Sequence, residues 1–184
     1  RHPEHDGMAI VGVSATDALG CLETGFALAL EAIIDQLVPE APDGAPMPGR
    51  VNVLVSSALT PGDLEALRDW IEAFGLDPLF VPDIGDSLDG HLIPEGYSPL
   101  SYGGTPVSSL RDLGRAMATL VIGPSLYAAA DRLHRKTGVP DHRFSRLVGL
   151  RACDELTQVL AEISGRRVPP RLERQRDQLL DAMV

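Results

Sequence analysis

Residues 51–75 read VNVLVSSALTPGDLEALRDWIEAFG, and this stretch decides the fold class. It opens with the apolar, β-branched run Val51 to Val55, which predicts a buried strand. Thr60 and Pro61 are typical of a helix start, because threonine caps free N–H groups and proline fits the first helical position. Gly75 then supplies the left-handed residue at which such a helix ends. The stretch therefore predicts a strand followed by a helix.

The same alternation of short apolar runs and helical stripes continues on both sides of this stretch. Further buried strands are expected at 9–13, 79–81, 118–122 and 141–144. Helices are expected where Phe26, Leu30, Ile33 and Leu37 recur, after Thr105-Pro106 with Leu110 and Leu113 facing inward, at 125–137, at 150–163 and from Pro169-Pro170 onward. Alternating strands and helices indicate an α/β fold, a parallel sheet flanked by helices.

Two stretches lack helical or strand periodicity. Residues 39–50 hold four prolines and two glycines, so we expect a linker or surface loop there. Residues 82–104 form a longer irregular stretch with repeated glycine and proline. Loops longer than about 12–15 residues are usually functional or interfacial. We therefore expect the 82–104 loop to contact a partner.

Composition narrows the class of protein. The chain has 184 residues, 44% of them hydrophobic and 23% charged, which is typical of a soluble globular protein with one main domain. No apolar run approaches the roughly 20 residues that cross a bilayer, so we expect no membrane span. Only Cys21 and Cys153 are present, which excludes a disulfide framework and suits a reducing cytoplasm. The chain starts at Arg1 without a signal pattern, so we expect it to be a piece of a longer protein.

The net charge of −10 is unevenly distributed. Residues 1–104 hold 17 acidic and 3 basic side chains, whereas residues 105–184 hold 9 acidic and 13 basic ones. An acidic surface of this size repels phosphate backbones. We therefore expect no nucleic-acid partner.

Candidate site residues each have a plainer structural interpretation. The turns at 56–60 and 103–105 could hold an anion at a helix start, but capping is favoured because no phosphate-binding glycine loop is present. His91 in SLDGHL could act in acid–base chemistry, yet a turn stabilised by Asp89 is favoured. Cys21 precedes a helix, which could lower the pKa of its thiol, but a buried position is favoured, as for Cys153.

The order of several uncommon strings is more informative than any single residue. They are LTPGDL at 59–64, IEAFGL at 71–76, SLDGHL at 87–92, GGT at 103–105, TGVP at 137–140, AEISG at 161–165 and RQRDQLLDAM at 174–183. In this order they resemble the nitrogenase component 1 family over essentially the whole chain. Within it, they look like the middle domain of a subunit that serves as a scaffold for cofactor assembly.

The resemblance implies a Rossmann-like fold and a role in a larger assembly. Residues 51–165 would be the central domain, joined through the 39–50 linker to a flank at 1–38 from a first domain, with 166–184 leading to a third. The subunit would pair with a second scaffold subunit in a heterotetramer. There it would mature a precursor of the iron-molybdenum cofactor with the help of the nitrogenase iron protein, beside an interfacial iron–sulfur cluster.

The resemblance places no catalytic residue and no metal ligand in this chain, because the cluster cysteine of such subunits belongs to the first domain. Asp17 alone aligns with a serine near the interface cluster of the catalytic β-subunit, and a surface or capping aspartate is the plainer interpretation. Thr16 and Ala18 replace the proline and phenylalanine usual there. The alternative function is a β-type subunit of nitrogenase, or of a related reductase, that takes part in electron transfer.

Overall fold

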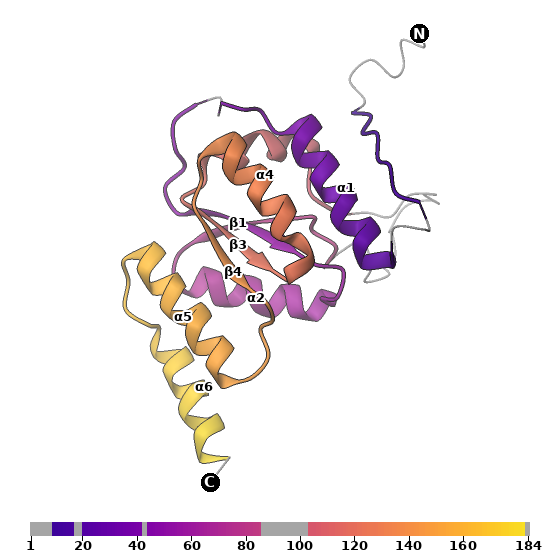
Figure 1. Ribbon diagram of the computed structural model, residues 1–184. Helices are drawn as coiled ribbons and strands as arrows, with labels where there is room; N and C mark the ends of the chain where they lie inside the picture. Colours follow the sequence, from indigo (N-terminus) through magenta and orange to yellow (C-terminus); the bar gives the residue numbers. More distant parts are fainter. Residues whose placement is uncertain (1–8, 17–19, 42–43, 86–102, 183–184) are drawn as a thin grey trace, which may run out of the picture.

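The computed structural model describes residues 9–16, 20–41, 44–85 and 103–182. Four strands form one sheet in the order β2-β1-β3-β4, and every neighbouring pair is parallel (Figure 1). They are β1 (Arg50–Val55), β2 (Asp77–Val81), β3 (Ala118–Ile122) and β4 (Asp141–Phe144). The predicted α/β fold with a Rossmann-like parallel sheet flanked by helices is confirmed.

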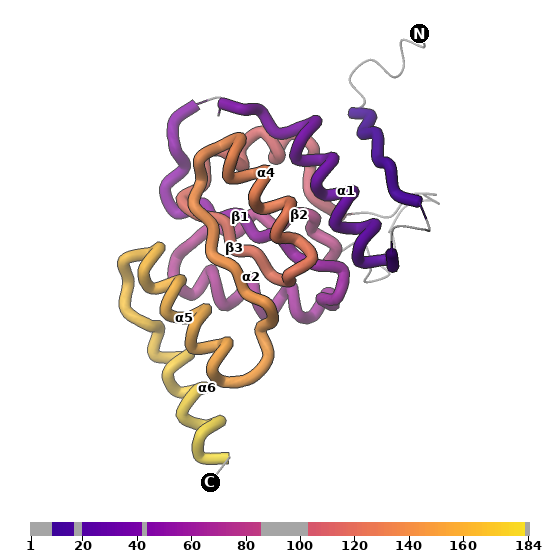
Figure 2. The backbone as a smooth tube through the Cα atoms, viewed as in Figure 1, coloured from indigo at the N-terminus to yellow at the C-terminus, as the bar shows by residue number. Residues whose placement is uncertain are grey.

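Helices cover both faces of the sheet (Figures 1 and 2). One face carries α1 (Leu22–Leu37), the 3₁₀ helices η3 (Val107–Arg115) and η4 (Pro124–Leu126), and α4 (Tyr127–Thr137). The other carries α2 (Pro61–Ala73), α5 (Leu150–Ser164) and α6 (Pro170–Asp181). None of the helices in the described ranges is long and apolar enough to cross a membrane.

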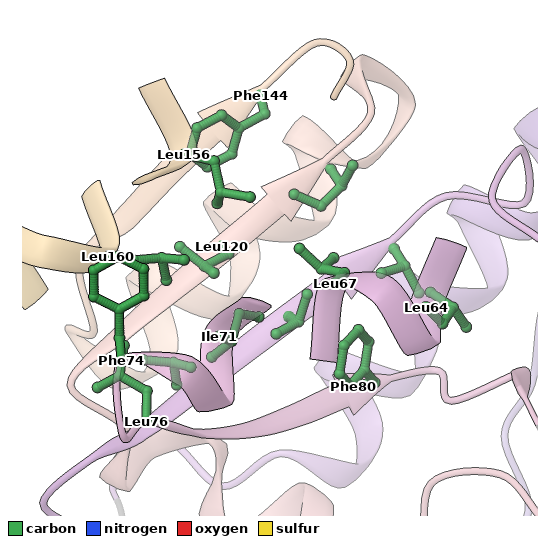
Figure 3. Close-up of a cluster of buried hydrophobic side chains, with 14 of the residues drawn as sticks. Leu64, Leu67, Ile71, Phe74, Leu76, Phe80, Leu120, Phe144, Leu156 and Leu160 are labelled. Carbon is green, nitrogen blue, oxygen red and sulfur yellow. The ribbon is translucent and has the colours of Figure 1, made fainter. Parts of the chain in front are cut away.

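The α2 face shows how the opening stretch folds. Thr60 and Asp63 cap α2 reciprocally: the Asp63 carboxylate accepts from the Thr60 N–H at 2.8 Å, and the Thr60 hydroxyl accepts from the Asp63 N–H at 3.3 Å. The predicted apolar stripe of α2 is buried and packs with side chains from β1, β2, β3, α5 and α6 (Figure 3). The stripe consists of Leu64, Leu67, Ile71 and Phe74.

On the opposite face, α1 and α4 run side by side in the same direction. Near their ends, the Lys136 ammonium donates to the carbonyls of Ile34, Asp35 and Val38 at 3.2, 2.6 and 2.8 Å. Arg132, one turn earlier, pairs with Glu31 at 2.7 Å and also with Asp35. A cation at the negative end of a helix dipole is favourable. These contacts attach α1 to the sheet domain.

Two expected elements differ from prediction. The Thr105-Pro106 signal does not cap an α-helix: η3 begins at Val107, and the Thr105 hydroxyl donates to the Phe80 carbonyl at 2.7 Å and accepts from the Asp83 N–H at 2.8 Å. Residues 9–13 were expected to form a buried strand, and that expectation is wrong. No strand is assigned there, and Ile10 is 82% exposed.

An ion pair joins α6, the last helix, to α5. Arg176 of α6 donates to both carboxylate oxygens of Asp154 of α5, at 2.7 and 2.9 Å. Leu172 is buried in the core, whereas Leu179 is 55% exposed, so only the first turn of α6 contributes to this core.

Candidate functional site

The carboxyl ends of β1 and β3 meet where the strand order reverses, which is where open α/β sheets bind ligands. Ser56 follows β1, is 4% exposed, and donates its N–H to the Ile122 carbonyl at 3.1 Å. Gly123 follows β3 with φ of 113°, and a Cβ on it would lie 2.8 Å from the Ser56 Cβ. Ser56 and Gly123 therefore pack directly against each other at the carboxyl edge of the sheet, between β1 and β3.

The start of α1 lies at the same edge. The Ser125 hydroxyl, just after β3, donates to the Glu23 carboxylate at 2.7 Å, although the two residues are 102 positions apart. Because α1 and α4 run in the same direction, both helices begin at the carboxyl edge of the sheet (Figure 1). The carboxyl edge of the sheet therefore brings the ends of β1 and β3 together with the start of α1, which precedes the sheet in sequence.

A cavity of about 330 Å³ lies beside the start of α1. Cys21 is exposed at its rim, and the Thr24 hydroxyl lies 3.8 Å from the Cys21 sulfur. The pKa of the Cys21 thiol lies below its ordinary value, chiefly through the Thr24 backbone N–H and then the Thr24 hydroxyl and the Glu23 backbone N–H. The lining residues are Ala15, Thr16, Gly20, Cys21, Leu22, Thr24, Gly25, Phe26 and Leu28. The cavity thus presents one exposed thiol, with a lowered pKa, among mostly small and apolar groups.

The expected burial of the two cysteines is only partly met. The buried position favoured for Cys21 is wrong, because the residue precedes the first turn of α1 and its side chain faces outward. Cys153 of α5 is half-buried, and that burial raises the pKa of its thiol. Within the described part of the chain, no three His, Cys, Asp or Glu side chains are grouped so as to hold a metal ion.

Several predicted site residues lie outside the described residues. They are Asp17, Ala18 and the SLDGHL string with Asp89 and His91. Thr16, beside Asp17, lines the cavity at α1. The two ends of the 82–104 loop are described, and the Thr105 hydroxyl joins them by its bonds to Asp83 and Phe80. The loop therefore leaves and returns at the carboxyl end of β2.

A second cavity was not anticipated from the sequence. It has a volume of about 580 Å³, lies where α1 and α4 end, and is lined by Asp35, Glu40, Arg132, Arg135 and Lys136. Its charges largely pair with each other or with the end of α1. In the sequence, this charged cavity is indicated by the spacing of Arg132 and Lys136, which places both side chains on one face of α4.

Comparisons with known proteins place this geometry in one family. The sequence model described as "Nitrogenase component 1 type Oxidoreductase" matches residues 1–184. The chain is similar to the proteins named "Nitrogenase iron-molybdenum cofactor biosynthesis protein NifN" of Klebsiella pneumoniae, at 44% identity, and of Nostoc sp., at 42%. Each alignment covers 100% of this chain and 40% of the relative.

A solved structure described as "Nitrogenase Cp1 at pH 6.5" has the same arrangement of chain. It superposes with a TM-score of 0.85 at 30% sequence identity, covering 94% of this chain and 37% of that one. The chain thus spans about 40% of the length of the curated relatives it matches. On the match to all 184 residues, the chain belongs to the nitrogenase component 1 type oxidoreductase family.

Proposed function

We propose that this chain forms the central, sheet-bearing part of a NifN-type scaffold subunit on which the iron-molybdenum cofactor is assembled. The observation that carries the proposal is the identity of 42–44% to NifN proteins over the whole chain, against 30% to a nitrogenase structure of the same fold. The alternative, a β-type subunit that takes part in electron transfer, shares the fold but has the weaker sequence support.

The physical role of these residues is that of a platform. The sheet is packed on both faces, and the two clusters of apolar side chains fix α1 and α2 relative to the strands. Close packing of this kind holds surface groups at fixed positions. In this proposal, the carboxyl edge of the sheet and the start of α1 form a rigid surface that contacts the rest of the assembly.

The residues present do not fit a complete iron–sulfur site. Such clusters are held by about four thiolates, and the chain has two cysteines, of which Cys21 lies at the start of α1 and Cys153 on α5. We therefore assign no cluster ligand to this chain. In the intact protein, the interfacial cluster and the cofactor precursor would be gripped by other segments, with Asp17 near the interface cluster.

The partners follow from the same proposal. The subunit would pair with a NifE-type subunit in a heterotetramer and would receive the nitrogenase iron protein, in the cytoplasm. The 82–104 loop and the exposed side of α6 are the proposed contact surfaces. Residues 51–165 would be the central domain, with 1–38 and 166–184 leading to neighbouring domains through the 39–50 linker and α6.

Cofactor transfer is the experiment that separates the two functions. The protein extended to the length of its relatives would be purified with a NifE-type subunit, loaded with precursor, molybdenum and homocitrate, and mixed with cofactor-deficient nitrogenase. A scaffold restores substrate reduction by the nitrogenase and reduces little substrate itself. A complex that reduces acetylene with the iron protein, and fails to activate the deficient enzyme, would instead be an electron-transferring subunit.

A further inference from the structure

The linker that leads into β1 lies along the residues that lead into β3. The Arg115 Nε donates to the Ala45 carbonyl at 2.8 Å, and the Met47 N–H donates to the Arg115 carbonyl at 2.8 Å. Further along the linker, the Gly49 N–H donates to the Met117 sulfur, with 3.1 Å between the nitrogen and Sδ. Three successive contacts therefore attach the end of the linker to the segment before β3, and the last of them uses a thioether as its acceptor.

Gly49 and Met117 also contact the first residues of the other strands. The Gly49 carbonyl accepts from the N–H of Asp77, which begins β2, at 2.8 Å. The Met117 N–H donates to the carbonyl of Arg50, which begins β1, at 2.8 Å. The contact between Gly49 and Met117 therefore lies at the amino edge of the sheet, where β1, β2 and β3 all start.

Met117 is the chemically reactive member of this junction, because it is 43% exposed. A thioether sulfur has two lone pairs, and oxidation at one or the other gives the two opposite sulfoxide epimers. The lone pair that faces Gly49 is shielded, because a nitrogen at 3.1 Å leaves no space for an oxygen that itself needs about 2.9 Å from that nitrogen. An oxidant therefore reaches the sulfur only through its second lone pair.

We propose that Met117 is a reversible oxidation site, at which a peroxide forms a single sulfoxide epimer and thereby breaks the contact with Gly49. The sulfur donates an electron pair to one oxygen of hydrogen peroxide, so that an S–O bond forms and the O–O bond breaks. The departing hydroxide takes the proton of the transferred oxygen and leaves as water. The sulfur has then lost two electrons, carries partial positive charge and no longer accepts from an N–H. A sulfoxide reductase reverses the step with two thiols, which form a disulfide while the oxygen leaves as water.

The effect of oxidation is confined to the end of the linker. Gly49 keeps the bond between its carbonyl and Asp77, and β1 keeps its pairing with β2 and β3. Oxidation should therefore leave the sheet folded while the Gly49 N–H becomes free to exchange with solvent. The amino edge thus carries a redox-sensitive contact in the segment that joins α1 to β1.

The stereochemistry of the sulfoxide tests the proposal. The 184-residue chain would be oxidised with hydrogen peroxide, once folded and once in urea, and digested with trypsin, which releases Met117 as the only methionine of peptide 116–132. That peptide would be incubated with MsrA or MsrB and dithiothreitol, and repair would be followed by mass spectrometry, since each reductase acts on one epimer. The folded chain should give a sulfoxide that one reductase repairs at least about tenfold more completely than the other, whereas the chain oxidised in urea should give similar repair by both. Similar repair by both after oxidation of the folded chain would overturn the proposal.

Amide hydrogen exchange at Gly49 tests the consequence of oxidation. Met117→Leu keeps an apolar side chain that peroxide does not oxidise, and Met47→Leu is the matched control that removes a thioether from the same linker. Peroxide should speed Gly49 exchange by about tenfold or more in the wild type and in Met47→Leu, and should leave it unchanged in Met117→Leu. Unchanged exchange in the oxidised wild type would show that the sulfoxide still accepts from Gly49 and would overturn the proposal, as would an equal change in Met117→Leu.

The same oxidation would be followed in the protein extended to the length of its relatives. Met117 should form its sulfoxide there as well, and complete protection of Met117 in the longer protein would overturn its role as a modification site. None of these measurements depends on cofactor assembly, so their failure leaves the proposed scaffold function standing.

Discussion

Gly123 lies so close to Ser56 that a Cβ on Gly123 would approach the Ser56 Cβ to 2.8 Å and its hydroxyl oxygen to 3.0 Å. This contact joins the carboxyl ends of the two central strands, where the candidate site begins. The φ of 113° at Gly123 is also one that side-chain-bearing residues rarely adopt.

Gly123→Ala should therefore destabilise the fold by about 2–4 kcal/mol, because strain and a backbone-proximal clash act together. Gly62→Ala is the matched control, since nothing lies within 4 Å of a Cβ there and its φ lies outside the left-handed region. The control should be neutral or stabilising by up to about 1 kcal/mol. Urea unfolding measures both, and equal stabilities would show that the Ser56 contact relaxes freely.

The cap that Lys136 provides for the end of α1 gives a second prediction. Lys136→Met should reduce stability by about 1–2 kcal/mol, because three carbonyls at the negative end of α1 lose their cation. Arg135→Met, the adjacent exposed cation, makes the same change in charge and should cost less than about 0.5 kcal/mol. Similar losses in the two variants would mean that net charge, rather than the cap, is responsible.

Much of this fold follows from local signals, and the exceptions have a common cause. Val51 to Val55 was predicted as a strand and forms β1, and Gly75 ends α2 with a positive φ of 69°. Residues 9–13 carry the same apolar signal as β1, yet they lie outside the central sheet. A local pattern records the preference for extended chain, but it does not say which sheet, if any, supplies the neighbour.

The candidate site was harder to predict, because its contacts join distant residues. Nothing near Ser125 indicates that its hydroxyl meets Glu23, 102 positions away, and nothing near Lys136 points to the end of α1. Cys21 was expected to be buried, but its position before the first turn of α1 leaves it exposed. Asp17 lies outside the described residues, so its proposed place near an interface cluster stays a prediction.

The capping box of α2 gives a pH-dependent prediction. The pKa of Asp63 lies below its ordinary value, chiefly because the Thr60 N–H and then its hydroxyl bond to the carboxylate. A depressed folded pKa contributes stability above the unfolded pKa of about 3.9 and loses it as the pH falls below that value. Asp63→Ala should therefore lower stability by about 0.5–1 kcal/mol at pH 7.

The difference between wild type and Asp63→Ala should shrink as the pH falls from 5 toward 3, when followed by thermal unfolding. Glu65→Ala, an exposed acidic position on the same helix, should show no such convergence. A constant difference across this pH range would mean that the Asp63 charge is not what stabilises the helix start.

The two thiols should differ in reactivity. Cys21 is exposed with a lowered pKa, and Cys153 is half-buried with a pKa raised by burial. Since the thiolate is the nucleophile, pulse alkylation with iodoacetamide at neutral pH should modify Cys21 roughly tenfold faster or more. Mass spectrometry of the two peptides gives the ratio, with Cys21→Ser and Cys153→Ser as single-thiol controls. Faster modification of Cys153 would contradict the exposed position of Cys21.

The most direct test of the proposed platform role is whether this chain binds a metal cluster by itself. After anaerobic reconstitution with iron, sulfide and reductant, the desalted 184-residue chain should remain colourless and hold no stoichiometric iron, because the proposed ligands belong to other segments. Iron analysis with visible absorbance decides the matter. About four irons per chain, with absorbance lost in Cys21→Ser and Cys153→Ser, would contradict the account of this chain as a platform.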